Sequence, residues 1–138
     1  MAALSADFNS YIKNQNALNS YTIAGSSNVY IGGLAQLDAT GNYVAPAASG
    51  VTRKIVGQFV KGAVSTTTTD TTVPVREGDI FLNLSANNPP TASNIGAQVY
   101  ADSDNEVTTL SSSRAKVGIL IALENGGAVV RCTQSSNL

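Results

Sequence analysis

From about Val29 to the C-terminus, short runs rich in Val, Ile, Tyr and Thr are separated by Gly, Asn, Asp or Ser, roughly every eight to twelve residues. β-Branched and aromatic residues favour extended backbone, and the residues between them favour turns. This spacing predicts an all-β fold, a small antiparallel β-barrel or sandwich, with no long helix after residue 21. The predicted strands are Asn28–Ile31, Leu34–Asp38, Tyr43–Ala45, Lys54–Val60, Thr71–Arg76, Asp79–Leu84, Ala97–Ala101, Glu106–Leu110, Lys116–Glu124 and Ala128–Thr133.

The clearest pairing signal lies near the C-terminus. Every second residue along Lys116–Glu124 is Val, Ile or Leu, which is typical of a strand with one buried face. The pair Asn125-Gly126 follows, and these residues best tolerate the positive φ angles of a type I′ turn. We therefore expect Lys116–Glu124 and Ala128–Thr133 to form an antiparallel hairpin.

The first twenty residues differ from the rest, because asparagine, glutamine and serine dominate them. Their few apolar residues could form one helical stripe at i, i+4, i+7 and i+8, but a helix of this length is too short to be stable alone. We interpret residues 1–20 as an extended arm that orders where it meets a partner, and residues 21–138 as a single β domain. A frayed tail is the alternative. The candidate contact residues of the arm are Leu4, Phe8, Tyr11 and Ile12.

The chain contains no histidine, no tryptophan and one cysteine, Cys132. Histidine carries out much general acid–base chemistry and metal ligation, so Ser-His-Asp and Cys-His nucleophile activation are excluded. Cys132 follows the apolar Val130 in the last predicted strand, and we expect it to be a buried small hydrophobe. The sequence therefore predicts a protein that is not an enzyme and needs no cofactor or metal.

Charge is sparse and scattered, with eight basic and nine acidic residues and a net charge of −1. A phosphate backbone would require a basic stripe, so we expect no nucleic-acid partner. The longest apolar run, Val117–Leu123, has a strand's length and falls far short of the ~20 residues of a membrane span. The N-terminus lacks the basic and apolar regions of a secretory signal. We expect no membrane partner.

The polar clusters look structural. Asp102–Glu106 holds three carboxylates, but an EF-hand loop would need glycine at its sixth position and glutamate at its twelfth, where this chain has Val107 and Ser113. We expect a polar turn there. Glu77–Asp79 is similarly predicted to be a turn, and the threonine-rich run Ser65–Thr72 a solvated connection or an exposed edge.

The sequence contains a weak internal similarity, called the sequence echo below. Gly33–Val44 can be laid over Gly96–Val107, and each stretch is followed by a Val-Gly pair, at Val56-Gly57 and Val117-Gly118. A duplicated half-barrel would explain the echo, and so would two hairpins that use common turn residues.

Several segments, in order along nearly the whole chain, resemble one family, the decoration or cement proteins of tailed-phage and prophage heads. The segments that carry the resemblance are Met1–Asp7, Tyr30–Asn42, Ile95–Asp102, Val117–Ile119 and Gly126–Arg131. The motifs are strand-and-turn patterns, and the family often has a basic residue where this chain has Phe8. It also usually lacks so long a threonine run.

The resemblance implies a small all-β, β-tulip-like fold and a structural role. Such proteins bind the outer surface of the expanded capsid, commonly as homotrimers, and brace neighbouring major capsid subunits. The implied partners are the major capsid protein and further copies of this chain. The implied location is the outer capsid surface of the virion, with the host cytoplasm during assembly.

A carbohydrate-binding β module of a head fibre or adhesin is the alternative function. It would use loop threonines and asparagines with an aromatic platform. The chain supplies that platform poorly, because it has five scattered tyrosines and no tryptophan.

Overall fold

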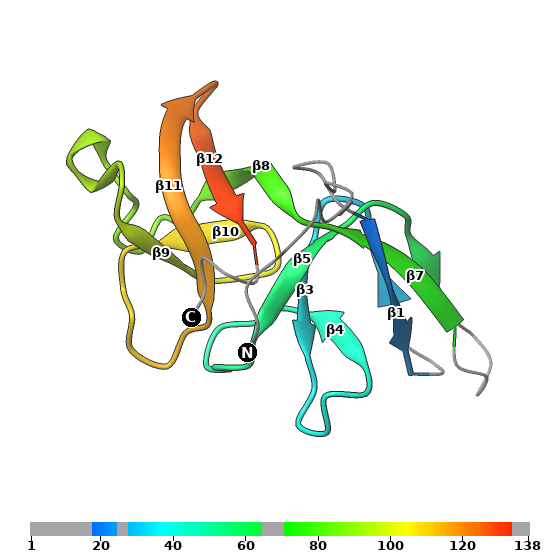
Figure 1. The fold of residues 1–138 in the computed structure, drawn as a ribbon. Coiled ribbons are helices and arrows are strands. Elements are labelled where there is room, and N and C mark those ends of the chain that lie inside the picture. The colour runs from blue at the N-terminus through cyan, green and yellow to red at the C-terminus, as the bar shows by residue number, and fades with distance from the viewer. Residues whose placement is uncertain (1–17, 25–27, 65–70, 134–138) are drawn as a thin grey trace, which may run out of the picture.

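The computed structural model describes residues 18–24, 28–64, 71–133 of the chain. These residues form twelve β-strands and one short 3₁₀ turn (Figure 1). The predicted all-β class, with a small barrel, is confirmed. The elements are β1 (Leu18–Ile23), β2 (Asn28–Val29), β3 (Leu34–Leu37), β4 (Val44–Pro46), β5 (Ile55–Phe59), β6 (Ala63–Val64), β7 (Thr71–Arg76), β8 (Gly78–Leu84), η1 (Ala92–Asn94), β9 (Gln98–Ala101), β10 (Glu106–Thr108), β11 (Lys116–Glu124) and β12 (Gly127–Cys132).

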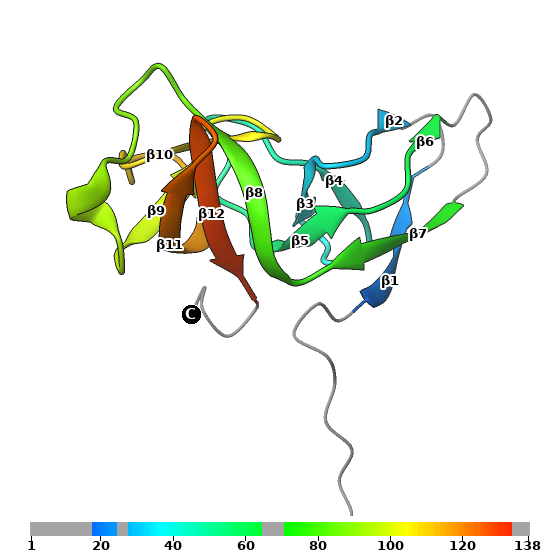
Figure 2. The same cartoon turned by 90° about the horizontal axis from the view of Figure 1, so that it is seen from above.

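The strands form an open sheet and a closed barrel that lie side by side (Figure 2). The open sheet has the order β1-β7-β5-β3-β4 and is antiparallel throughout. The barrel has the order β10-β8-β12-β11-β9, and its only parallel pair is β8 with β10. A two-stranded ribbon, β2 with β6, completes the described part.

A single residue, Glu77, carries the chain from the open sheet into the barrel. The sequence predicted a turn at Glu77–Asp79, but the structure has a bend, and β7 leads directly into β8 (Figures 1 and 2). Gly78 has φ +135°, a value that side-chain-bearing residues rarely adopt, so it redirects the strand without reversing it.

The predicted C-terminal hairpin is confirmed. β11 and β12 pair from Ile119 opposite Arg131 to Glu124 opposite Gly127, with a bulge between Leu120 and Ala122. The two turn residues have positive φ, +53° at Asn125 and +74° at Gly126, as a type I′ turn requires.

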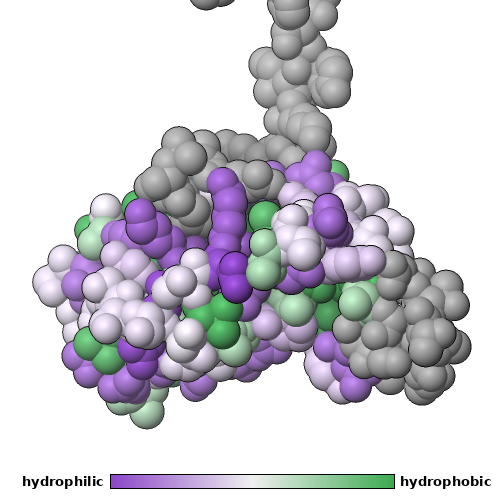
Figure 3. Space-filling view, turned by 90° about the horizontal axis from the view of Figure 1, so that it is seen from below, coloured by the Kyte–Doolittle hydropathy of each residue, from purple (hydrophilic) through white to green (hydrophobic). Residues whose placement is uncertain are grey.

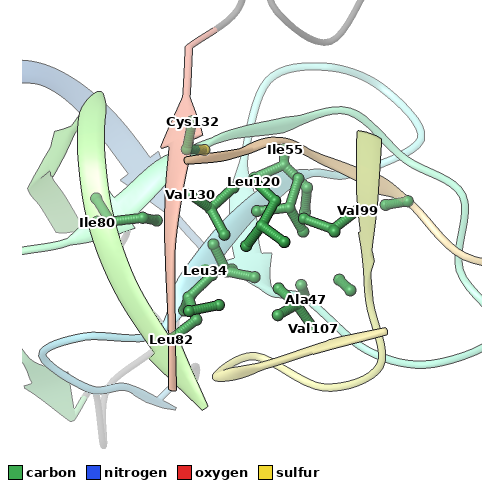
Figure 4. Packing of buried hydrophobic residues seen from close by; sticks show 14 residues of the cluster. Leu34, Ala47, Ile55, Ile80, Leu82, Val99, Val107, Leu120, Val130 and Cys132 are labelled. Atoms are coloured by element: carbon green, nitrogen blue, oxygen red, sulfur yellow. The ribbon is translucent and has the colours of Figure 1, made fainter. Parts of the chain in front are cut away.

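Two apolar clusters fill the molecule. One lies inside the barrel, where Val99, Leu120 and Val130 pack together with Leu34 and Ile55 from the first half of the chain (Figure 4). The other lies on the opposite face of the open sheet and is made of Ile23, Val29, Ala35, Val44, Val56, Phe59, Val73 and Val75. Because Leu34 and Ile55 enter the barrel cluster, the open sheet is attached to the barrel by apolar burial.

The open sheet and the barrel repeat one topology. Five strands of the first half, taken across the sheet, run β1-β7-β5-β3-β4, and their counterparts in the barrel run β8-β12-β11-β9-β10. The counterparts also occur in the same order along the chain. The halves differ at one step: β10 pairs with β8 and closes the barrel, whereas β4 does not pair with β1.

Equivalent backbone hydrogen bonds support this correspondence. The Gly32 N–H donates to the Phe59 carbonyl at 2.8 Å, and in the second half the Gly96 N–H donates to the Leu120 carbonyl at the same distance. Two further equivalent pairs are Leu37 N to Lys54 O with Ala101 N to Ala115 O, and Asp38 N to Tyr43 O with Asp102 N to Glu106 O. The structure therefore favours a duplicated half-barrel as the explanation of the sequence echo.

The structural match also corrects the register of the echo. Gly32, not Gly33, is equivalent to Gly96, and both have φ +91°. The turn between β3 and β4, closed by Asp38 and Tyr43, is one residue longer than the turn closed by Asp102 and Glu106. The gap-free alignment of Gly33–Val44 with Gly96–Val107 therefore pairs equivalent residues after this turn. Before the turn it pairs each residue with one that is a single position away from its structural equivalent.

Candidate functional site

A groove lined by both apolar and polar side chains lies where the open sheet meets the barrel. It consists of two adjoining hollows of about 310 and 350 Å³, which share Ile31, Gly32, Gln58 and Phe81 in their walls. Ile31 is 74% exposed and Phe81 46% exposed, which is unusual for large apolar side chains. Exposed apolar groups gathered in one hollow mark an interaction surface more often than scattered ones do.

Local backbone geometry presents Ile31 to solvent. After β2 the chain makes a tight turn, in which the Gly33 N–H donates to the Tyr30 carbonyl at 3.1 Å. Gly32 allows this turn because its φ of +91° favours glycine. The turn leaves the neighbouring Tyr30 and Ile31 exposed.

Phe81 reaches the groove from the barrel. Residues along β8 alternate between buried and exposed, and Phe81 lies on the outer face, between the buried Ile80 and Leu82. Its ring occupies the space beside Gly127 on the neighbouring strand β12, where a Cβ atom would collide with it. Gly127 therefore makes room for the aromatic wall of the groove.

A polar pair forms the floor. The Arg76 Nη2 donates to Gln58 Oε1 at 3.0 Å, and the Gln58 Nε2 donates to the Gly32 carbonyl at 3.0 Å. These bonds fix the Gln58 side chain across the junction. Two buried side-chain atoms, Gln36 Oε1 and Arg76 Nε, have no hydrogen-bond partner within the described part of the chain.

The carboxylate cluster after β9 has a structural role. Asp102 accepts hydrogen bonds from the Ser85 hydroxyl at 2.6 Å and from Arg114 Nε at 2.8 Å. The Ser85 bond, followed by Arg114, lowers the pKa of Asp102. The expected polar turn is confirmed, since Asp102 N and the Glu106 carbonyl close it. Among the residues that the structure describes, no group of three or more metal-ligating side chains is placed to hold an ion.

Cys132 is fully buried, as the sequence predicted. Burial, and then the nearby Glu77 carboxylate, raise the pKa of Cys132 to about 12. The thiol is therefore protonated at neutral pH and shielded from solvent, which makes it chemically inert.

The predicted arm residues, Leu4, Phe8, Tyr11 and Ile12, lie outside the described residues, as does most of the threonine run. The last three residues assigned to the arm, 18–20, belong to β1. The sequence does not mark Ile31 and Phe81 as surface groups. The strand predicted at Asn28–Ile31 ends at Ile31, and the following Gly32-Gly33 pair is a turn signal.

On the face of the molecule seen from below, apolar side chains form small patches separated by polar ones (Figure 3). This pattern agrees with the scattered charges of the sequence. No helix in residues 18–24, 28–64 or 71–133 has the length and apolar character needed to cross a membrane.

The fold and the groove define a class of protein, an all-β protein of two topologically equivalent halves with a surface groove between them. Comparison of the chain with protein-family models, with curated proteins and with solved structures finds no match.

Proposed function

We propose that this protein is a structural virion component that binds the outer surface of the expanded phage capsid and stabilises contacts between major capsid subunits, as a homotrimer. The resemblance of its sequence segments to capsid decoration proteins supports this proposal. The exposed apolar side chains of the all-β body are consistent with it, because such side chains can be buried against a neighbouring subunit.

One observation carries the proposal. Ile31 and Ile95 each precede one of the equivalent glycines, Gly32 and Gly96, so they hold the same place in the two halves. Both are exposed, Ile31 by 74% and Ile95 by 50%. A capsid offers many copies of one subunit, and a protein that displays the same contact twice can engage two of them.

Two weak contacts from one protein can together give firm binding to a capsid lattice. Each isoleucine contact is weak alone, but once one half is bound, the second contact forms within the same complex at a high effective concentration. A ligand that binds only the expanded lattice stabilises that lattice by mass action. The net charge of −1 gives little electrostatic steering, so we expect binding to depend only weakly on salt.

The test compares Ile31→Ser, Ile95→Ser and the double variant for co-sedimentation with expanded capsids of the phage or prophage that encodes the chain. Either single change should weaken binding, and the double change should weaken it by roughly tenfold or more beyond either single change. Val51→Ser is the matched control, because Val51 is a partly exposed β-branched residue that lies outside the two equivalent turns and lines neither hollow of the groove. Capsid binding by the double variant equal to that of the unaltered protein would refute the proposal.

A carbohydrate-binding module is the second candidate, and the groove supplies an observation in its favour. One hollow has Tyr30 and Phe81 beside the polar side chains of Asn83, Asp104 and Asn105. An aromatic ring next to amide and carboxylate groups can bind the apolar face and the hydroxyls of a sugar. Binding on a glycan array that Asn83→Ala abolishes, together with failure to bind capsids, would favour this function.

A further inference from the structure

A hollow outside the groove is lined mainly by basic side chains. It measures about 330 Å³ and lies between the segments that lead into β5 and β11. Four of its seven lining residues are basic and none is acidic. We call it the basic hollow, and its basic residues are Arg53, Lys54, Arg114 and Lys116. The chain has eight lysines and arginines in all, so folding gathers half of its basic side chains in one place.

The two sides of the basic hollow are equivalent in the two halves of the fold. The carbonyls of Lys54 and Ala115 accept equivalent backbone hydrogen bonds, each of 2.9 Å. Arg53 and Arg114 directly precede them, so these arginines hold the same place in the two halves. Because both line the hollow, a ligand there meets one arginine from the open-sheet half and one from the barrel half.

The positive charge of the basic hollow is only partly paired. Arg114 Nε donates to Asp102 Oδ1 at 2.8 Å and Arg114 Nη1 to the Ser112 carbonyl at 2.9 Å, which fixes this guanidinium and pairs its charge. Arg53 and Lys54 are exposed, and neither side chain makes an ion pair or a hydrogen bond with the residues that the structure describes. Like charges repel, and an anion that binds between them relieves that repulsion.

These donors suit a phosphate group. A guanidinium donates two parallel hydrogen bonds to an oxyanion, and an ammonium group adds a point charge. A phosphate group carries about −1.5 to −2 charges at pH 7 and three strong acceptor oxygens, so one such group balances both Arg53 and Lys54. A single carboxylate brings one charge and leaves the other cation unbalanced.

The basic residues form a cluster and not a stripe. A nucleic-acid backbone presents a line of phosphates and requires a matching line of cations. Lys61 follows the opposite end of β5 from Arg53, and Arg76 lies opposite Gln58, also towards that end. Among the described residues the cluster therefore does not continue along β5, and it fits a single anionic group.

We propose that the basic hollow is a binding site for a small oxyanion of the phosphate class, held between Arg53 and Arg114 and balanced by Lys54 and Lys116. The basic hollow shares no lining residue with the groove. The proposal concerns the protein without any capsid, so it holds or fails independently of the proposed function.

Titration of the full chain with inorganic phosphate tests the proposal, with the ionic strength held constant by sodium chloride. The amide NMR signals of Lys54 and Lys116 should move to saturation, while those of Gly32 and Phe81 in the groove should stay in place. Signals that never saturate would overturn the proposal. Succinate, a dicarboxylate of similar total charge, is the second ligand, and it should bind more weakly. Succinate binding as tight as that of phosphate would overturn the assignment to phosphate and favour an acidic protein segment.

Three variants locate the site. Arg53→Gln and Lys54→Gln should each weaken phosphate binding by about tenfold, because each removes a charged donor. Lys61→Gln is the matched control, since it removes one charge from an exposed lysine that does not line the basic hollow, and it should leave phosphate binding unchanged. If Lys61→Gln weakened binding as much as Lys54→Gln does, binding would depend on overall charge and the proposal would fail.

Discussion

Gly57 and Gly118 occupy equivalent positions in the two halves, because at each of them the neighbouring strand comes too close for a side chain. A Cβ atom on Gly57 would lie 2.5 Å from the Arg76 carbonyl oxygen, and one on Gly118 would collide with the Arg131 carbonyl oxygen. Arg76 and Arg131 are themselves equivalent, since they lie opposite the residues that follow the two glycines, Gln58 and Ile119. The open sheet and the barrel thus both use a glycine at this position to let the neighbouring strand approach closely.

We predict that Gly118→Ala lowers the free energy of unfolding by about 2 kcal/mol or more, because the collision is with backbone that cannot rotate away. Gly62→Ala is the control, as its Cβ would make only an ordinary 3.4 Å contact. Urea unfolding followed by circular dichroism measures both. A loss for Gly118→Ala no larger than that for Gly62→Ala would contradict the close packing of β11 against β12.

The buried thiol predicts a particular dependence of stability on alkaline pH. Burial raises the pKa of Cys132 to about 12, above the value of about 8.5 expected in the unfolded chain. Between these two pKa values the Cys132 thiol is therefore protonated in the folded state and ionised in the unfolded state. The resulting stability is fully present below the unfolded pKa and is lost as pH rises towards the folded pKa, by about 1.4 kcal/mol per pH unit.

Comparison with Cys132→Ala isolates this effect, because tyrosines and lysines titrate equally in both proteins. Between pH 9 and pH 11, the free energy of unfolding of the unaltered protein should fall more than that of the variant. The difference should grow by about 1.4 kcal/mol per pH unit. Parallel pH profiles of the two proteins would show that the thiol is not buried as the structure describes.

At the scale of elements, two ion pairs connect strands in different surroundings. Arg114 and Asp102 are each only 15% exposed, and with Ser85 they join the ends of β8 and β9 to the segment before β11. Asp79 and Arg131 connect β8 to β12 on the exposed surface. A partly buried, hydrogen-bonded carboxylate is worth more than one on the surface.

We predict that Asp102→Asn destabilises the protein by about 2 kcal/mol at pH 7, and Asp79→Asn by less than about 1 kcal/mol. Ser85 and Arg114 lower the pKa of Asp102, so its contribution is present above the unfolded value of about 3.9 and is lost as pH falls through the folded pKa. Thermal melts at pH 7 and pH 3 should show the gap between Asp102→Asn and the unaltered protein narrowing in acid. A gap independent of pH would mean that the charge of Asp102 is unimportant.

The sequence predicted the strands best where local signals were strong. Thr71–Arg76 and Lys116–Glu124 agree residue for residue, because alternation and flanking turn residues define them. β1 was missed, since Leu18–Ile23 continues an asparagine-rich segment and becomes a strand only by pairing with β7. The groove could not be predicted, because Ile31 and Phe81 come together only through the packing of sheet against barrel.

At the scale of the whole molecule, the pairing of β1 limits what can be removed when the arm is tested. Residues 18–20 pair with β7, so a deletion must stop at residue 17 to keep the sheet intact. We predict that the chain lacking residues 1–17 keeps its β circular dichroism spectrum and no longer co-sediments with expanded capsids.

The full-length variant Leu4→Ser, Phe8→Ser, Ile12→Ser is the control for any loss of folding in the truncated chain, and it should bind capsids equally poorly. If either protein bound expanded capsids as well as the unaltered chain does, the arm would not be a capsid contact.

A cryo-EM map of expanded phage capsids that carry this protein, or have been incubated with it, tests the proposed function most directly. We predict density for the open sheet and the barrel on the outer surface, in groups of three, with the turns at Ile31 and Ile95 against capsid subunits. A shell whose outer surface lacks this density, in particles shown by mass spectrometry to contain the protein elsewhere or not at all, would contradict the proposal.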